Sequence, residues 1–286
     1  MTKTAFLAIL SLQICLDRRG FSPNAMDGQV GDKTRAALAA YCTANGLPPP
    51  TPGEEADAFK RYFPNEPDLF VTTEVTAADI AELVQIPDSP AKKAALPRMG
   101  YETIAEMFAE RGHVTPNTLR RLNPKVAWTN VTVGTKIMLP EVSPVAFGDK
   151  AALVKVSLSR FTVTALDAAR RPIAVYPCSI ARDKAKRPPP GEIRIVSRIA
   201  DPNYTYTPDH TPRGKKPARH IFPPGPNNPV GTVWLGLSIP GYGIHGSPTP
   251  ERIGRAESHG CFRLANWNAE KLYELVTPGT RVLIEQ

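Results

Sequence analysis

Two short segments near the end of the chain hold the residue types that acyl-transfer chemistry needs. Gly243 to Ser247 reads Gly-Ile-His-Gly-Ser, and Ser258 to Leu264 reads Ser-His-Gly-Cys-Phe-Arg-Leu. A cysteine attacks as its thiolate, and a nearby histidine is a common base or positive neighbour that produces the thiolate. His245 precedes Cys261 by 16 residues. The pair predicts a site at which a thiol attacks a carbonyl group, with His245 as general base.

Each neighbour of Cys261 has a chemical role to consider. The glycine before it lets the backbone come close to a reacting carbonyl, so the N–H groups of Gly260 and Cys261 could stabilise an oxyanion. Ser258 could hydrogen-bond within the same turn, and His259 could support the thiolate or only shape the turn. Arg263 could bind a substrate carboxylate through two hydrogen bonds, or pair with an acid on the surface.

Other interpretations of these residues are structural or metal-binding. A lone cysteine is often a buried structural residue, and a lone histidine is often a core residue. His245, His259 and Cys261 could also supply three zinc ligands, with His210 or His220 as the fourth. Against zinc, the motif contains no second cysteine and no His-Glu-x-x-His spacing. The glycine next to Cys261 and the two histidines of the motif favour a catalytic role over these alternatives.

Taken together, these segments resemble the L,D-transpeptidase family of cell-wall enzymes, also called the YkuD-like family. His245 and the run from Ser258 to Arg263 match its signature position by position, with Arg263 where other members carry asparagine. The likeness covers roughly residues 148 to 286. Three upstream segments extend it: Pro190 to Ile195, Gly225 to Gly231 and Trp234 to Leu237.

The resemblance implies a reaction on peptidoglycan that needs no cofactor and no metal. The donor would be a stem tetrapeptide, cut between its third residue, a diamino acid, and its terminal D-alanine. Cys261 would hold the acyl group as a thioester. The backbone carbonyl of Gly246 would hold the second ring nitrogen of His245. A stem amine as acceptor gives a 3→3 cross-link, whereas water, a D-amino acid or a protein lysine gives hydrolysis, exchange or lipoprotein anchoring.

Charge is unevenly distributed along the 286 residues, whose net charge is +8. Residues 148–286 carry 20 Lys and Arg against 11 Asp and Glu, and residues 1–147 carry 15 against 16. A basic catalytic domain suits an anionic partner such as a polymer with free carboxylates. No nucleic-acid-binding motif is present, so we expect no nucleic acid, and the resemblance implies peptidoglycan as the partner. A non-catalytic wall-binding scaffold would share this charge and is the alternative from another functional class.

The first 47 residues predict a small all-α module of helix, turn and helix. Its first helix should end near Gly20, and Asp32 should cap the second, from Lys33 to Ala44. The Asp-Gly-x-x-Gly connector that starts at Asp27 resembles the peptidoglycan-binding module. The residues expected on the inner face of the first helix are Ala5, Ile9, Leu12 and Leu16.

The N-terminus also bears on location. The stretch from Met1 to Leu16 mimics a short signal peptide, but no small-residue cleavage site follows it, and we interpret it as a helix of the fold. No run of residues approaches the length of a membrane span. A peptidoglycan enzyme belongs in the periplasm or cell envelope, so we expect that location although no signal peptide is evident. The oligomeric state is not predicted.

Between the two ends, the sequence predicts a linker and a third unit. Residues 48–95 read as a proline-rich linker followed by a poorly patterned region, with a helix from Ala77 to Val84 capped by Thr76. Residues 96–142 resemble a degenerate LysM carbohydrate-binding segment, in which two helices precede a strand ending at Pro140. Its usual opening strand is missing or altered, so a spacer is the other interpretation.

The C-terminal residues 148–286 predict a mainly-β domain. Ala152 to Leu158 and Arg160 to Leu166 should form a hairpin, and Asn266 should cap a late helix. The stretch from Asp201 to Pro229 should be a long excursion, either a substrate-binding flap or a plain surface loop. Its basic residues include Arg213, Lys215, Lys216, Arg219 and His220. The whole chain is therefore expected to be multidomain: an all-α module, an α+β LysM-like segment and a mainly-β catalytic domain.

The other cysteines are expected to be structural. Cys15 and Cys42 should lie late in two helices of one small module, where either a disulfide or two buried free thiols would fit. Cys178 follows an apolar run and is expected to be a buried strand residue. Pairing of Cys178 with Cys261 is the least favoured arrangement.

Overall fold

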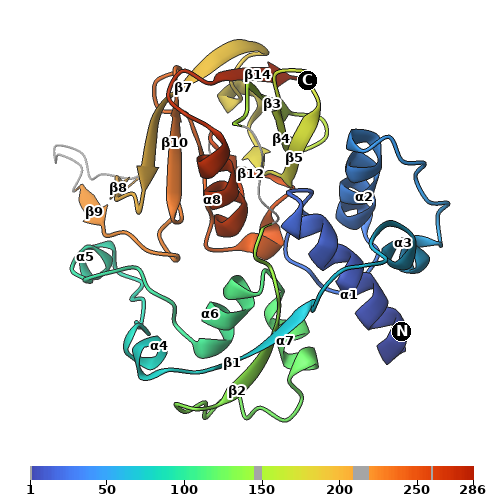
Figure 1. The fold of residues 1–286 in the computed structure, drawn as a ribbon. Coiled ribbons are helices and arrows are strands. Elements are labelled where there is room, and N and C mark those ends of the chain that lie inside the picture. The colour runs from blue at the N-terminus through green and yellow to red at the C-terminus, as the bar shows by residue number, and fades with distance from the viewer. Residues whose placement is uncertain (1, 145–149, 209–218, 259) are drawn as a thin grey trace.

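A curved sheet of eight strands forms the C-terminal part of the molecule, and helices and a two-stranded sheet pack beside it (Figure 1). The computed structural model describes residues 2–144, 150–208, 219–258 and 260–286. In that part of the chain, no helix combines the length and apolar character that crossing a bilayer requires.

The large sheet carries the candidate site at one end. Its strand order is β13-β11-β10-β7-β14-β3-β4-β5. The strands are β3 (Leu153–Ser157), β4 (Thr162–Leu166), β5 (Pro172–Pro177), β7 (Gly191–Ala200), β10 (Val233–Leu237), β11 (Gly243–His245), β13 (Phe262–Arg263) and β14 (Arg281–Glu285). Helix α8 (Asn266–Leu275) packs against β10 and β11 and closes the core beneath them. The mainly-β prediction for this domain is confirmed.

Strand β14 joins the two halves of the sheet. It pairs in parallel with β3 and antiparallel with β7. The turn before it reads Thr-Pro-Gly-Thr: Gly279 has φ +96°, and the N–H of Thr280 donates to the carbonyl of Thr277 at 3.0 Å. The predicted hairpin of β3 and β4 is also confirmed.

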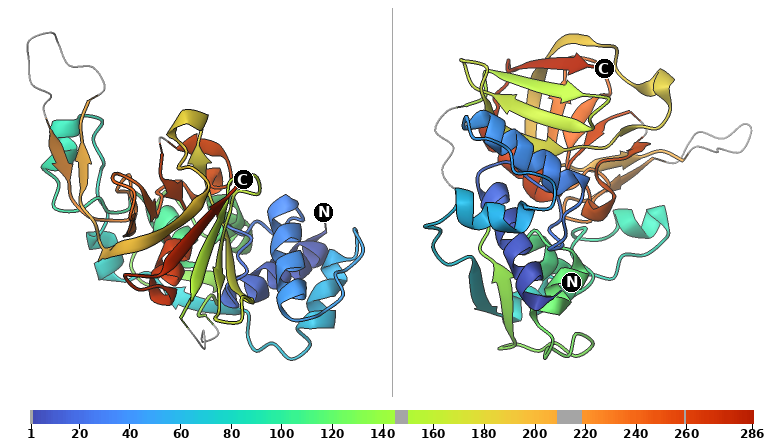
Figure 2. Two further views of the ribbon diagram at one scale, coloured as in Figure 1. Left: turned by 90° about the horizontal axis from the view of Figure 1, so that it is seen from above. Right: turned by 90° about the vertical axis from the view of Figure 1, so that its right-hand side faces the viewer.

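Short elements surround the site end of the sheet. They are β6 (Ile180–Ala181), β8 (Tyr204–Tyr206), β9 (His220–Phe222), β12 (Ala256–Ser258), η1 (Lys184–Lys186) and η2 (Pro250–Arg252). Strand β6 pairs with β12, and β8 pairs with β9 as a ribbon that projects from the body of the molecule (Figure 2). The ribbon lies within the predicted excursion. Within that excursion, His210, Arg213, Lys215 and Lys216 lie outside the described residues.

Helix α1 (Lys3–Arg18) is the central element of the N-terminal half. The sequence predicted that one face of this helix is buried. In the structure the buried surface is wider, because every residue from Ile9 to Asp17 is buried. The reason is that α1 lies between two hydrophobic clusters (Figure 1). Its residues Phe6, Leu10 and Ile14 belong to one cluster, and Leu12, Cys15 and Leu16 belong to the other.

Two further helices complete the N-terminal module, α2 (Asp32–Ala44) and α3 (Glu55–Tyr62). Asp32 does not cap α2: Gly31 is the N-cap, and Asp32 is in the first turn. Helix α3 packs on α1, so the predicted linker region contains part of this module. Cys15 and Cys42 are both buried and are free thiols.

The next unit, residues 69–142, is called the middle segment below. Its elements are β1 (Phe70–Glu74), α4 (Ala77–Ala81), α5 (Pro90–Ala94), α6 (Ile104–Arg111), α7 (Pro116–Leu122) and β2 (Lys136–Pro140). The segment also contains a strand ahead of its helices that the sequence did not predict, β1, which pairs antiparallel with β2 along its whole length. This strand escaped notice because it lies before the expected boundary and lacks an alternating burial pattern. The LysM-like character of the segment stays a prediction.

A buried ionic cluster joins all three units. The carboxylate of Asp17 in α1 accepts a hydrogen bond from Lys271 Nζ of α8 at 2.6 Å, and its Oδ2 lies 2.7 Å from Nδ1 of His113 in the middle segment. The His113 ring stacks on Trp267, with ring centroids 4.9 Å apart. Burial opposes the charge of Asp17, but Lys271 and His113 outweigh it and hold the pKa of the carboxyl well below its usual range.

Breaking this cluster should destabilise the fold. In Asp17→Asn the buried ammonium of Lys271 loses its counter-charge, which costs about 3–5 kcal/mol of unfolding free energy. Because the pKa of Asp17 is depressed, the difference from wild type should be complete above about pH 4 and shrink only in stronger acid. Urea unfolding at several pH values measures this.

The matched control is the exposed pair of Lys155 and Glu285, with N···O at 2.8 Å. Lys155→Gln should change the unfolding free energy by no more than about 1 kcal/mol. Equal effects of the two substitutions would contradict the importance of the buried cluster.

Candidate active site

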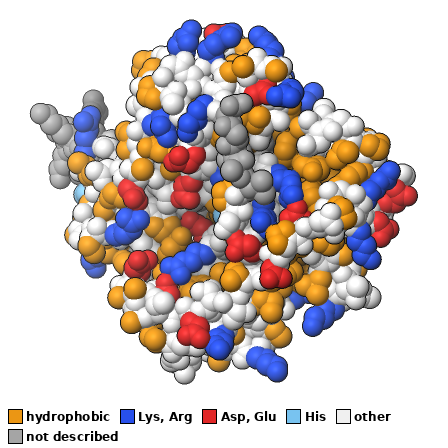
Figure 3. Space-filling model, viewed as in Figure 1, with side chains coloured by type: hydrophobic (Ala, Val, Ile, Leu, Met, Phe, Trp, Pro, Cys, Tyr) orange, Lys and Arg blue, Asp and Glu red, His pale blue; other side chains and the backbone are white. Residues whose placement is uncertain are grey.

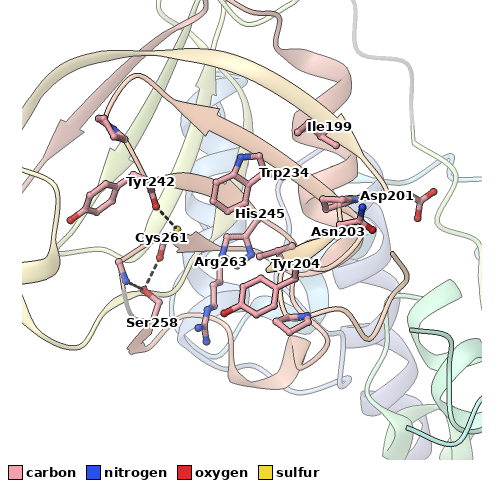
Figure 4. A pocket seen from close by; sticks show the side chains of 16 residues that line it. Ile199, Asp201, Asn203, Tyr204, Trp234, Tyr242, His245, Ser258, Cys261 and Arg263 are labelled. Carbon is pink, nitrogen blue, oxygen red and sulfur yellow. Dashed lines mark hydrogen bonds between the residues drawn. The ribbon is translucent and has the colours of Figure 1, made fainter. Parts of the chain in front are cut away.

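Pairing of two short strands brings the histidine and the cysteine of the motif together. Strand β11 runs parallel to β13, with Ile244 opposite Phe262 and His245 opposite Arg263. Cys261 directly precedes β13, so it lies beside the start of β11. His245, Cys261 and Arg263 line one pocket of about 850 Å³ at this end of the sheet (Figure 4).

His245 is held by the backbone and by an aromatic ring. Its Nδ1 lies 2.7 Å from the carbonyl oxygen of Gly246. A carbonyl only accepts, so this contact places the proton on Nδ1 and leaves Nε2 as a hydrogen-bond acceptor. The ring stacks on Trp234, with centroids 5.5 Å apart and planes 18° from parallel. The contact with Gly246 is the one that the family resemblance implies.

Burial determines the charge of His245, whose exposed fraction is 3%. Loss of hydration is the main cause that lowers the pKa of His245 to about 4. The carbonyls of Gly246 and Val230 act in the opposite direction, and the positive charge of Arg263 lowers the pKa. The imidazole is therefore neutral at pH 7 and able to accept a proton.

Cys261 is half-buried, and its Sγ donates to the carbonyl of Gly241 at 3.6 Å. Burial raises the pKa of the thiol above its ordinary value, although a backbone hydrogen bond of Gly243 and the charge of Arg263 oppose this. The resting site thus pairs a neutral thiol with a neutral imidazole. This environment disfavours a preformed thiolate–imidazolium pair and fits a general base that removes the thiol proton as the reaction begins.

The turn before Cys261 is braced by Ser258. Its hydroxyl donates to the carbonyl of Cys261 at 2.6 Å, and the N–H of Gly260 donates to the same hydroxyl oxygen at 3.3 Å. A Cβ on Gly260 would meet only ordinary contacts, at 3.6 Å or more. The neighbouring atoms therefore leave space for a side chain at Gly260. His259 lies outside the described residues.

At Gly246, in contrast, the surrounding atoms leave no space for a side chain. A Cβ there would lie 2.3 Å from Oδ1 of Asn266 and 3.2 Å from Cα of Gly231. Gly231 is equally confined, with φ +62° and a Cβ position 2.0 Å from the same oxygen. The backbone after His245 can approach the loop that contains Gly231 only because both residues lack side chains.

Asn266 is the residue of this region that sequence reasoning assigned wrongly. It was predicted to cap α8, but Ala265 holds the N-cap position and makes no side-chain cap. The amide of Asn266, which is 1% exposed, instead bonds to the loops around His245. Its four partners are the N–H groups of Ser247 and Thr232, the carbonyl of Pro226 and the carboxylate of Glu110. No local pattern distinguishes such an asparagine from a cap.

Arg263 is anchored by its backbone and offers its side chain to the pocket. Its N–H and C=O bond to Ser179 at 2.9 and 2.8 Å, an antiparallel bridge outside the named strands. Figure 4 shows its guanidinium beside Tyr204, below His245. Asp201 lies at another part of the same lining and pairs with Arg98 at 3.0 Å.

Further lining residues were not singled out as site residues from the sequence. They are Ile199, Asp201, Asn203, Tyr204, Trp234 and Tyr242. Only Trp234 carried a signal, as part of a segment that resembles the family. Ile199 lies on β7, Asp201, Asn203 and Tyr204 come from the excursion, and Tyr242 comes from the turn between β10 and β11, so their convergence depends on the tertiary fold.

The described residues do not assemble a metal site. Among residues 2–144, 150–208, 219–258 and 260–286, no three His, Cys, Asp or Glu side chains group as metal ligands would. His220 lies on β9 and does not line the pocket. His210 and His259, the other histidines of the zinc interpretation, are outside those ranges.

Comparison with known proteins gives consistent matches. Residues 151–284 match the L,D-transpeptidase catalytic domain, YkuD. A putative L,D-transpeptidase YkuD of Bacillus licheniformis is 30% identical over 180 residues, which cover 63% of this chain and 92% of that protein. A putative L,D-transpeptidase of Fuscovulum blasticum is 38% identical over 112 residues, or 38% of this chain, and the match spans 57% of its length.

Solved structures give weaker likenesses. L,D-transpeptidase 3 of Mycobacterium tuberculosis aligns with 55% of this chain and 77% of its own at 16% identity, with a TM-score of 0.38. The catalytic domain of an E. faecium L,D-transpeptidase acylated by ertapenem aligns with 49% of this chain and 100% of its own at 19% identity, with a TM-score of 0.36. The sequence relatives carry the assignment: the chain belongs to the L,D-transpeptidase (YkuD) family of acyl-transferring enzymes.

Proposed function

We propose that this chain is a cysteine-dependent L,D-transpeptidase that acts on peptidoglycan stem tetrapeptides. The observation that carries the proposal is the neutral His245, fixed by the carbonyl of Gly246 beside Cys261 in an open pocket. This arrangement has a nucleophile, a base in the correct tautomer and a group that orients the base.

Acylation begins from the neutral pair. Nε2 of His245 accepts the thiol proton as Sγ of Cys261 forms a bond to the carbonyl carbon between the diamino acid and D-alanine. The carbonyl oxygen becomes an oxyanion, for which the N–H groups of Gly260 and Cys261 are the proposed donors. When the intermediate collapses, the C–N bond breaks and the imidazolium returns the proton to the leaving amine. D-Alanine departs, and the thioester stays on Cys261.

Deacylation repeats these steps with a new nucleophile. The side-chain amine of a second stem attacks the thioester, His245 accepts a proton, and the thiolate leaves and is reprotonated. The product is a 3→3 cross-link. Water, a D-amino acid or a protein lysine would attack the thioester in the same way and give a different product. The site therefore determines the class of reaction, and the acceptor determines the product.

The surroundings of the site suit a carboxylate-bearing polymer. We assign Arg263, whose guanidinium lines the pocket, to a substrate carboxylate. Lys and Arg side chains also gather over the upper part of the molecule, where the large sheet lies (Figure 3). Peptidoglycan is thus the proposed partner, and the cell envelope is the proposed location.

Ertapenem tests the proposed nucleophile. Intact-mass spectrometry should show one covalent adduct on wild-type protein and none on Cys261→Ala. Cys178→Ala is the matched control and should retain the adduct, because Cys178 is fully buried and lies outside the pocket. An unmodified wild type would favour the non-catalytic scaffold.

A disaccharide-tetrapeptide substrate then identifies the product by mass. A dimer shows cross-linking, a tripeptide shows hydrolysis, and an exchanged terminal residue shows D-amino acid transfer.

Alkylation tests the charge state of the resting pair. With a raised pKa, Cys261 is mostly thiol at pH 7, and its rate of reaction with iodoacetamide should rise about tenfold per pH unit up to its pKa. The measurement is adduct formation against time from pH 6 to 10 in native protein. A rate that is already constant from pH 6 to 8 would show a preformed ion pair instead.

Substitution of Arg263 tests its role in binding. Arg263→Gln should lower kcat/KM roughly 10–100-fold, the value of a charged hydrogen bond of about 1.5–3 kcal/mol, mainly through a higher KM. Each substrate carboxylate is then amidated in turn. Amidation of the carboxylate that Arg263 binds should harm wild type and have no further effect on the variant. Additive losses for every carboxylate would exclude this contact.

A further inference from the structure

We infer that the middle segment positions the general base, through Glu110 and Asn266 and through a clamp on the loop of residues 223–232. This inference rests on the proposed function of His245 and deepens it. Glu110 and Asn266 are positioning residues, since neither lines the pocket.

The first step of the argument is the contact between Asn266 and the backbone that follows His245. Oδ1 of Asn266 accepts from the N–H of Ser247 at 2.9 Å and from the N–H of Thr232 at 3.3 Å. One oxygen therefore joins the end of β11 to the 223–232 loop. Gly246 lies between them, and its carbonyl is the group that holds the imidazole.

The second step is the contact that orients the amide itself. Nδ2 of Asn266 donates to Oε1 of Glu110 at 2.8 Å and to the carbonyl of Pro226 at 3.1 Å. The two ends of an amide have nearly the same shape, so only its partners decide which end faces the N–H groups. Glu110 comes from α6, in the middle segment, and supplies an acceptor that a flipped amide would lose.

The third step is the clamp on the loop. Nδ2 of Asn227 donates to Oε1 of Glu106 at 2.6 Å and to the carbonyl of Gly100 at 3.0 Å. The N–H of Asn227 donates to the carbonyl of Met99 at 3.0 Å. Gly225 packs so closely on Met99 that a Cβ would lie 2.3 Å from its carbonyl oxygen.

The clamp ends close to the imidazole. Three residues after Asn227 comes Val230, whose backbone carbonyl interacts with the ring of His245. Both carbonyls that hold the ring, those of Gly246 and Val230, are therefore on backbone that the middle segment fixes. Misplacement of a catalytic group by about 1 Å can lower a rate about 100-fold, so these distant contacts are able to affect catalysis.

Glu110 has a conservative replacement. Burial raises its pKa to about 7, so its carboxyl and carboxylate forms are both present near neutrality, and each offers an oxygen to Asn266. Glutamine matches the neutral form and keeps this oxygen. Glu110→Gln should therefore act like wild type, whereas Glu110→Ala removes the acceptor.

The experiment measures the ertapenem acylation rate of full-length variants against pH, with the thermal midpoint recorded for each. Glu110→Ala should acylate about 10–100-fold more slowly at pH 7. A loosened loop admits water to His245, and this should raise its pKa, because burial is the main cause of the low value. The fall in rate at low pH, which is the acid limb of the pH–rate profile, should therefore move to higher pH. Glu110→Gln should show the acylation rate and the acid limb of the wild-type protein.

Asp79→Asn is the matched structural control. Asp79 is buried in the same segment, pairs with Arg111 at 2.6 Å and caps α4 with Thr76, and neither of these contacts involves the 223–232 loop. It should lower the thermal midpoint and leave the rate and pH profile of the folded protein unchanged. If Glu110→Ala behaves like Asp79→Asn, the inference is overturned.

A second readout separates this inference from the proposed function. The ring of His245 is titrated by NMR in wild type and in Glu110→Ala, with His245→Gln used to assign the signal. The pKa should rise towards 6.5 in Glu110→Ala. Failure of the wild type to acylate would overturn the proposed function. Independently of that result, an unchanged pKa of the His245 ring in Glu110→Ala would overturn the positioning role.

Discussion

The geometry of the site depends on one buried amide. Asn266 connects the end of β11, the loop before β10 and a helix of the middle segment, and each of its two polar atoms serves two partners. Gly231 and Gly246 are glycines because this amide occupies the space their side chains would need. The imidazole of His245 is held by a carbonyl in this same packing, so its tautomer and orientation follow from contacts that extend across three parts of the chain.

Much of the site could be predicted from sequence because its determinants are local. The motif around Cys261, the spacing to His245 and the hairpin of β3 and β4 are each contained within short stretches of chain. The partner of the His245 ring, the carbonyl of Gly246, is the adjacent residue and came from the resemblance to the family. Local hydrogen bonds and strand pairing across tight turns are what sequence patterns encode well.

The rest could not be predicted, because it depends on contacts between distant residues. Asn266 looked like a helix cap, and only the fold places Glu110 beside it, 156 residues away in sequence. Helix α1 was expected to bury a single face, because its packing against the middle segment depends on the tertiary fold and leaves no local pattern. The low pKa of His245 likewise comes from burial, which no motif reports, and it keeps the imidazole neutral in the resting site.

The position of β14 has a consequence for how the protein is made. Among the described residues, the sheet hydrogen bonds that link the strands of the site, β13, β11, β10 and β7, to β3, β4 and β5 run through β14, the last strand of the sheet to be synthesised. Its pairing with β3 closes a loop of more than a hundred residues, the kind of non-local contact that slows folding. A nascent chain would therefore assemble the N-terminal helices and the middle segment first. The sheet that carries the pocket of His245 and Cys261 would then be complete only after β14 has been synthesised.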